Sequence, residues 1–227
     1  HLLPLAVAVA AAGIIVGSVT ITGIQMGISR ELVRMSGGSI PFLLLLTAIT
    51  SFVMGLGVGI VGCYVFLATL VAPALVSMGV SPIAAHLFIF YWAVVSDITP
   101  PLCLTAFTAA SFARANPMSV GWQATRIGIV TYVLPFIWVL KPALITLGTP
   151  VEIIMVLMST AVGVYGLTLG IGGFFKGRLN WPQRIASIIG SFLVIFGTGA
   201  VVDSVGVALI GVTIVWQLFK GESLENG

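Results

Sequence analysis

Charged residues are scarce in this chain of 227 residues, of which only 7% are Asp, Glu, Lys or Arg while 59% are hydrophobic. A typical soluble domain carries about 25% charged residues and about 50% apolar ones. So few charges cannot cover the surface of a water-soluble fold, which excludes that class of protein. The composition therefore predicts an all-α integral membrane protein, because helices satisfy their own backbone groups inside a bilayer.

Several functional motifs are missing as well. The net charge of +3 comes from scattered Lys and Arg without a basic run, which argues against nucleic-acid binding. Cys63 and Cys103 lie in apolar stretches without the spacing of metal ligands, so we expect no bound cofactor and no metal ion other than Na⁺ as a coupling ion. No phosphate-binding loop occurs, so any active transport would use an ion gradient rather than ATP bound by this chain.

The apolar stretches predict a bundle of about six to eight helical elements, two of them broken, because one crossing needs about 20 apolar residues. They occupy residues 2–25, 40–76, 82–113, 127–140, 151–175, 185–202 and 204–219. The stretch 40–76 is too long for one crossing and is rich in glycine, whereas 82–113 is cut near its middle at residues 97–101.

Basic residues predict which loops face the cytoplasm, because Lys and Arg in short loops resist translocation. The residues expected on that side are Arg30, Arg34, Arg114, Arg126, Lys176, Arg178, Arg184 and Lys220. Arg114 and Arg126 flank a predicted loop before residue 127, and the C-terminus is predicted to be cytoplasmic. Lys141 falls on the outside in this layout, where it could anchor a helix end by snorkelling.

The strongest candidate site is the Ser-Asp-Ile-Thr-Pro-Pro motif at residues 96–101. Thr99 precedes a proline and is predicted to be the N-cap of an outgoing half-helix over residues 100–113. The positive end of that half-helix suits an anion, and the carbonyl end of the incoming half, residues 82–96, suits a cation. Secondary transporters bind anionic substrates and Na⁺ between such half-helices. The alternative is a proline kink that only shapes packing.

From this motif we predict two sets of contacts. The predicted substrate contacts are Thr99, Pro100, Pro101 and Thr105. The predicted Na⁺ ligands are Ser96, Asp97 and Thr99, joined by backbone carbonyls at Gly55, Gly57 and Gly59. The glycine run 55–62 is equally well explained by close helix packing or by a hairpin that turns inside the membrane. The Gly-x-x-x-Gly pairs at residues 13 and 17, and at residues 166 and 170, predict packing faces.

Two other ionisable groups lie in or beside apolar stretches. His86 is about three helical turns, or about 16 Å, before Asp97, which is too far for direct proton transfer. We therefore expect His86 to hydrogen-bond to a neighbouring helix rather than to act in a proton relay. Asp203, at the start of the last apolar stretch, is predicted to be a helix cap.

An ordered series of motifs resembles one known family. The series is Ala-Pro-Ala-Leu at 72–75, Gly-Val-Ser-Pro at 79–82, Ala-Ala-His-Leu-Phe at 84–88, the motif at 96–101, Gly-Trp-Gln-Ala-Thr-Arg at 121–126, Leu-Pro-Phe at 134–136 and Lys-Pro-Ala-Leu at 141–144. It resembles the large membrane subunit of tripartite ATP-independent periplasmic (TRAP) transporters, in particular fused permeases that work with a TAXI-type binding protein. The resemblance covers residues 13–147 well and the rest more loosely.

The resemblance implies a Na⁺-driven secondary importer in a bacterial or archaeal inner membrane, where a periplasmic binding protein delivers an organic acid. It implies an inverted-repeat fold with re-entrant hairpins, of which this chain is similar to the C-terminal half. Residues 1–147 would form the C-terminal repeat, with broken helices near 55–62 and 96–101, and residues 148–227 an extension of about three crossings. The expected partners are the binding protein, the N-terminal permease half and a small membrane subunit, separate or fused.

One departure from the family pattern affects the predicted ion ligands. Fused permeases of this type usually carry Pro-Thr-Thr where this chain has Gly59, Ile60 and Val61. Two hydroxyl groups are therefore absent, and any ion ligand in this segment must be a backbone carbonyl.

The sequence leaves two other classes of function open. A passive channel or scaffold subunit is one alternative. An intramembrane aspartyl protease using Asp97 and Asp203 is another, but that chemistry needs two carboxylates close enough to share a proton.

Overall fold

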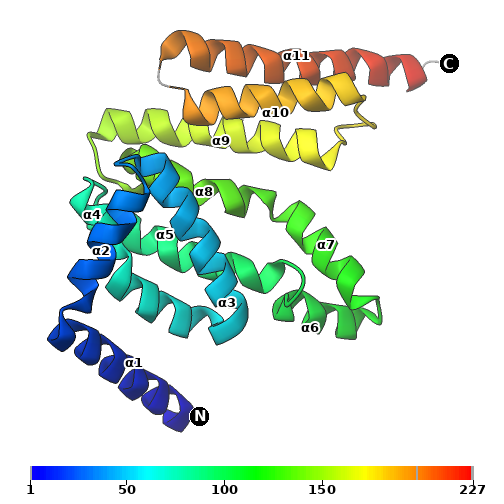
Figure 1. Cartoon of the computed structure of the whole chain (residues 1–227). Coiled ribbons are helices and arrows are strands. Elements are labelled where there is room, and N and C mark those ends of the chain that lie inside the picture. Colours follow the sequence, from blue (N-terminus) through cyan, green and yellow to red (C-terminus); the bar gives the residue numbers. More distant parts are fainter. Residues whose placement is uncertain (1, 198, 226–227) are drawn as a thin grey trace. The chain divides into compact units, whose positions relative to one another are not determined.

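The computed structural model describes residues 2–197 and 199–225, and these residues form helices joined by short turns (Figure 1). Extended pairing in the described part is limited to an isolated bridge between Phe174 and Arg178. The helical stretches long and apolar enough to cross a membrane are Ile40–Leu70, Pro117–Leu140, Pro150–Gly172 and Val201–Leu218. The prediction of an all-α, multi-pass membrane protein is confirmed.

The chain forms two compact units, residues 1–124 and residues 125–227. Helix α7 (Pro117–Ile127) runs across the boundary between them. Each unit has its own packed helices and is described separately. The division into a repeat and an extension at residue 147 stays a prediction.

The first unit is built around the packing of α3 against α5. Its elements are α1 (Leu2–Thr22), α2 (Ile24–Met35), α3 (Ile40–Leu70), α4 (Ala72–Ser77), α5 (Pro82–Val95), the 3-10 turn η1 (Ser96–Ile98) and α6 (Leu104–Ala113). The fully buried side chains at its centre include Leu43, Leu44, Ala84, Phe88 and Ile89. Small residues on α5 let the two helices approach closely, as expected where packing rather than water exclusion holds helices together in lipid.

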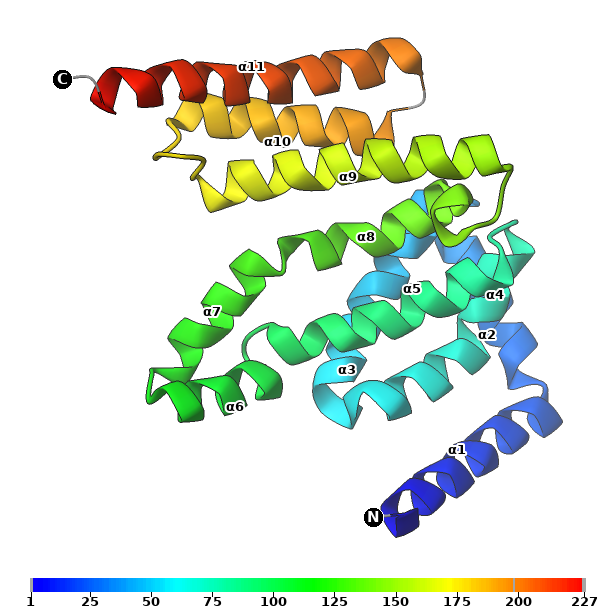
Figure 2. The same ribbon diagram turned by 180° about the vertical axis from the view of Figure 1, so that it is seen from behind.

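Helix α3 folds back on itself at Gly59. This residue has φ 75° and ψ 168°, a conformation that is essentially restricted to glycine. The Cys63 Sγ atom lies 3.3 Å from the Ser51 carbonyl oxygen, to which it donates a hydrogen bond, whereas a straight helix would separate these residues by about 18 Å. Figure 2 shows the two arms of this hairpin, residues 40–58 and 60–70, meeting at the bend. The hairpin explains why the apolar stretch 40–76 is too long for one crossing.

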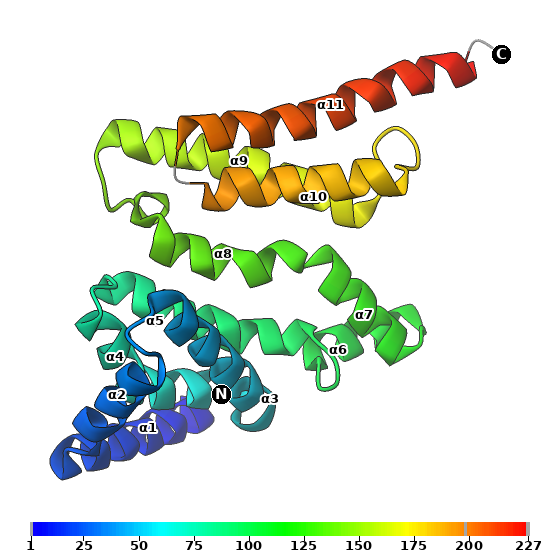
Figure 3. The same ribbon diagram turned by 45° about the horizontal axis from the view of Figure 1, so that its top comes forward.

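The second unit is a layer of antiparallel helices in which α10 lies between α9 and α11 (Figure 1), and Figure 3 shows the same layer from another side. Its elements are the end of α7, α8 (Ile129–Leu140), the 3-10 turn η2 (Pro142–Ile145), α9 (Pro150–Gly172), α10 (Trp181–Phe196) and α11 (Ala200–Glu225). A Cβ built on Gly166 would lie 2.5 Å from Ser191 Oγ, and one on Gly170 would lie 2.5 Å from Ile188 Cγ1. The glycine pair at 166 and 170 is therefore a packing face, as predicted. The pair at 13 and 17 has no described neighbour within 4 Å.

Several helix boundaries differ from the sequence-based expectation. Residues 117–127 form helix α7 rather than a loop, because Asn116 Oδ1 accepts the Ser119 N–H and Pro117 follows the cap. Helix α10 ends at Phe196, several residues before the predicted end. Helix α11 already begins at Ala200, so Asp203 lies in its first turn and is not its cap.

Candidate functional site

The predicted break in residues 82–113 is present, and it separates α5 from α6. Helix α5 begins at Pro82, where Ser81 Oγ accepts the Ala84 N–H, and it tightens into η1 at Ser96. Thr99 then has extended backbone angles, φ −113° and ψ 126°, and two prolines follow it. Proline lacks the N–H that would continue the helix, and it disfavours helical geometry at the preceding residue. Local chemistry therefore explains the position of the break.

Thr99 does not cap the outgoing helix, which corrects the sequence-based prediction. Its hydroxyl donates a 2.7 Å hydrogen bond to the Val95 carbonyl, so it satisfies the end of the incoming helix instead. Helix α6 begins at Leu104, with Cys103 as its N-cap and no side-chain cap hydrogen bond. The outgoing half-helix is therefore residues 104–113 rather than 100–113. Residues 99–103 form a non-helical linker between the two halves.

A carboxylate lies beside the first turn of α6. The Thr105 hydroxyl donates to Asp97 Oδ2 at 3.5 Å, which places the Asp97 side chain near the positive end of this helix. Thr105 is exposed, and Asp97 is half-buried. The break thus contains one fixed negative group next to a helix end that attracts anions. Two residues from the predicted substrate and ion sets are brought together here.

The glycine run and the break also meet. A Cβ built on Gly55 would lie 2.6 Å from Ser96 Oγ and 3.0 Å from the Ala93 carbonyl oxygen. Ser96 is 1% exposed, and its hydroxyl donates to the Ala93 carbonyl at 2.7 Å. Gly57 and Gly59 are exposed instead, with no described heavy atom within 4 Å of a Cβ built on either. Only Gly55 of the three glycines contacts the break.

Pro100 and Cys103 of the break pack against a residue that the site prediction did not include. Gly121 on α7 packs against the linker: a Cβ there would lie 2.5 Å from Cys103 Sγ and 3.2 Å from Pro100 Cγ. Pro100 is half-buried and Pro101 is exposed. The sequence did signal Gly121 through the Gly-Trp-Gln-Ala-Thr-Arg motif, but only the fold shows that it faces the break.

His86 lies away from the break, on the outer side of α5. Its Nδ1 atom is 3.2 Å from the Tyr64 hydroxyl on the second arm of the α3 hairpin, and Phe90 packs edge-on against Tyr64. The predicted hydrogen bond of His86 to a neighbouring helix is therefore present. These residues border an apolar groove of about 480 Å³ lined by Tyr64, Pro82, Ile83, His86, Leu87 and Phe90.

Together, the hairpin and the divided helix define a class of protein: a polytopic membrane protein with helices interrupted inside one packed unit, the construction used by secondary-transporter permeases. The family model described as "Tripartite ATP-independent periplasmic transporter, DctM component" matches residues 2–153. The chain belongs to this family, the large permease of TRAP transporters. Neither a search of curated proteins nor a search of solved structures gave a match.

Family membership has two consequences. It supports a role in transport, since the family consists of transporters rather than enzymes. It also implies a periplasmic binding protein and a small membrane subunit as partners. The resemblance drawn from the sequence motifs is thereby confirmed at the level of the family. The matched region includes both the α3 hairpin and the break after α5.

Proposed function

We propose that this chain is part of a Na⁺-coupled TRAP permease that imports an organic acid handed over by a TAXI-type periplasmic binding protein. The small subunit and the other permease half act with it, as separate or fused chains, in a bacterial or archaeal inner membrane. The C-terminus lies in the cytoplasm. The observation that carries the proposal is the position of Asp97 beside the first turn of α6.

The substrate carboxylate binds at the start of α6. A helix N-terminus carries a partial positive charge and free N–H groups, and no side chain caps this one. Thr105 supplies a hydroxyl there, while Thr99, Pro100 and Pro101 form the linker that keeps the helix end open. These features suit an anion with hydrogen-bond acceptors.

The cation binds at the end of the incoming helix, beside Asp97. Carboxylate, carbonyl and hydroxyl oxygens are the hard ligands that Na⁺ prefers, and Asp97, Ser96 and Thr99 offer them. The contact between Gly55 and Ser96 brings the backbone of the hairpin to the same place. Gly57 and Gly59 would contribute carbonyls from the exposed tip of the hairpin.

The charge of Asp97 couples the two binding events. Two negative charges about 6 Å apart repel each other by about 3 kcal/mol at an effective dielectric constant of about 20. That repulsion corresponds to about a 100-fold loss of substrate affinity. A Na⁺ ion beside Asp97 removes this penalty, so the organic acid binds well only when Na⁺ is present.

Uptake by the reconstituted complex with its binding protein tests the proposal, using a panel of radiolabelled mono- and dicarboxylates. We expect saturable uptake that requires an inward Na⁺ gradient. Asp97→Asn should remove the dependence on Na⁺, whereas Asp203→Asn, a matched change at another acid, should retain it. Uptake of wild type that is indifferent to Na⁺ would refute Na⁺ coupling. Flux that neither saturates nor needs the binding protein would indicate a passive channel.

A further inference from the structure

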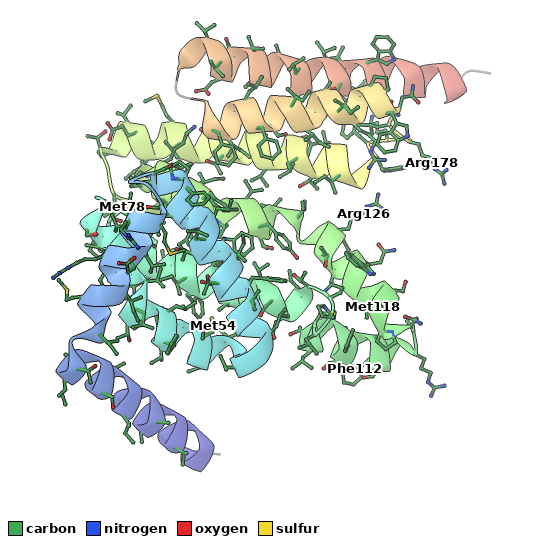
Figure 4. All side chains as sticks on the ribbon, viewed as in Figure 1. Met54, Met78, Phe112, Met118, Arg126 and Arg178 are labelled. Atoms are coloured by element: carbon green, nitrogen blue, oxygen red, sulfur yellow. The ribbon has the colours of Figure 1, made fainter. Side chains whose placement is uncertain are left out.

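Four of the described cations of the second unit gather at one end of its helical layer, whereas Lys141 donates to the Val194 carbonyl at the other end. Arg126, Lys176, Arg178 and Arg184 lie where α9 ends and α10 begins. The acidic side chains described in this unit, Glu152 and Asp203, lie at the starts of α9 and α11, which is the opposite end of the antiparallel layer. Among the described residues, none of the four cations forms an ion pair. We call these four residues the basic cluster; Figure 4 labels two of them, Arg126 and Arg178.

Two of the cations are fixed in place by the end of α9. Arg184 donates from Nε to the Gly170 carbonyl at 2.8 Å and from Nη2 to the Ile171 carbonyl at 3.0 Å. Arg126 donates from Nη2 to the carbonyls of Ile171 and Gly172 at 3.2 and 3.1 Å. These bonds use about two of the five N–H groups of each guanidinium, so donors remain for an external anion. Two full positive charges also outweigh the partial negative charge of one helix end.

The other two cations are carried by a tight loop. Phe174 and Arg178 pair in an antiparallel bridge, and the Phe175 N–H donates to the Gly177 carbonyl at 2.9 Å. Lys176 lies at the tip of this loop with φ 51°. Lys176 and Arg178 are both exposed, so their charges are available at the surface. The loop therefore adds two cations to the pair fixed on α9.

Aromatic residues place the basic cluster at a membrane surface. Helix α9 has 23 residues, or about 34 Å, which matches a hydrocarbon core about 30 Å thick. Trp181 and Phe174, which flank the loop, are 72% and 63% exposed. The Arg184 guanidinium stacks on the Trp181 ring with its carbon 4.9 Å from the ring centroid. Exposed Trp beside fixed Arg is typical of the level of lipid headgroups.

We propose that the basic cluster binds the phosphate of an anionic phospholipid headgroup. The guanidinium groups of Arg126 and Arg184 hold the phosphate, Lys176 and Arg178 close over it, and Trp181 and Phe174 contact the glycerol and upper acyl region. The site is independent of the break after α5 and of any coupling ion. Its effect is to anchor the second unit at one depth in the membrane.

Quenching of tryptophan by brominated phosphatidylglycerol tests the site. The full permease complex is placed in phosphatidylcholine nanodiscs, and brominated phosphatidylglycerol is titrated in. The signal of Trp181 is obtained as the difference from Trp181→Phe. Each cation near an anionic lipid surface contributes about 1 kcal/mol, or about 5-fold in affinity. The double variant Lys176→Asn/Arg178→Gln should therefore weaken phosphatidylglycerol binding about 25-fold.

A matched variant controls for net charge. Arg114, like Lys176, is a cation in the left-handed backbone region, with φ 49°. Arg30→Gln/Arg114→Asn removes the same net charge from the first unit and should leave the Trp181 signal unchanged. Equal weakening in both double variants, or none in either, would overturn the proposal. Loss of quenching on addition of millimolar inorganic phosphate would instead identify a site for free anions. Brominated phosphatidylcholine at the same mole fraction should quench Trp181 only as much as lipids that are randomly distributed around the protein.

Discussion

Gly55 lies against Ser96 so closely that a Cβ atom on Gly55 would come within 2.6 Å of Ser96 Oγ. This relationship joins the two interruptions that the sequence contains, the glycine run of α3 and the break after α5. A small change at either residue should therefore affect both.

Gly55→Ala should destabilise the permease by about 1–3 kcal/mol, because the added methyl group overlaps both Ser96 Oγ and the Ala93 carbonyl. The thermal midpoint of the purified complex measures this loss. Gly57→Ala is the control, since its Cβ would meet no described atom. Adding Ser96→Ala to Gly55→Ala should restore part of the loss; a double variant no better than Gly55→Ala would contradict the contact.

Gly59→Ala should also destabilise the fold, by about 1–3 kcal/mol, but for a reason that involves no contact. Its backbone lies at φ 75° and ψ 168°, where a side chain is strained whatever the space around it. Gly62→Ala should cost little, because its Cβ would make only ordinary contact with Val58 at 3.7 Å. Similar thermal midpoints for the two variants would show that the bend lies elsewhere.

Gly166→Ala should loosen the layer of α9, α10 and α11. The added carbon would lie 2.5 Å from Ser191 Oγ and 2.6 Å from Ile210 Cδ1, so both neighbouring helices would have to shift. We expect a loss of about 1–3 kcal/mol and faster proteolysis at the turns between these helices. Gly211→Ala, in open space on α11, is the control. Equal proteolysis rates for the two variants would count against this packing.

Arg184→Gln should weaken the end of α9. The change removes two charge-assisted hydrogen bonds to Gly170 and Ile171 and a favourable charge near a helix C-terminus, which together contribute about 2–4 kcal/mol. Amide hydrogen exchange in the last turn of α9 should accelerate. Arg178→Gln removes the same charge from a side chain with no such bond and should leave that turn protected. An unchanged exchange rate in Arg184→Gln would contradict this prediction and would mean that the bonds from Arg126 alone hold the last turn of α9.

Much of the candidate site followed from local sequence, and its errors have physical causes. The break after α5 was predictable because proline chemistry acts on the neighbouring residues. The start of α6 was not, because residues 99–103 form a non-helical linker in which Pro100 and Cys103 pack against Gly121 of another helix. Residues 117–127 were expected to form a loop because they include polar side chains, although Asn116 caps a helix there by accepting the Ser119 N–H.

By itself, the sequence determined the membrane class and the helical content, since both follow from composition. It also determined the places where helices break, since glycine and proline change the backbone of the residues next to them. Only the tertiary structure decided which of these breaks lie in contact and which helix end the Arg side chains bind. Gly55 reaches Ser96 because α3 folds back at Gly59, and Arg126 reaches the end of α9 because α8 and α9 lie side by side. Such contacts depend on packing between segments far apart in the chain, which no local pattern encodes.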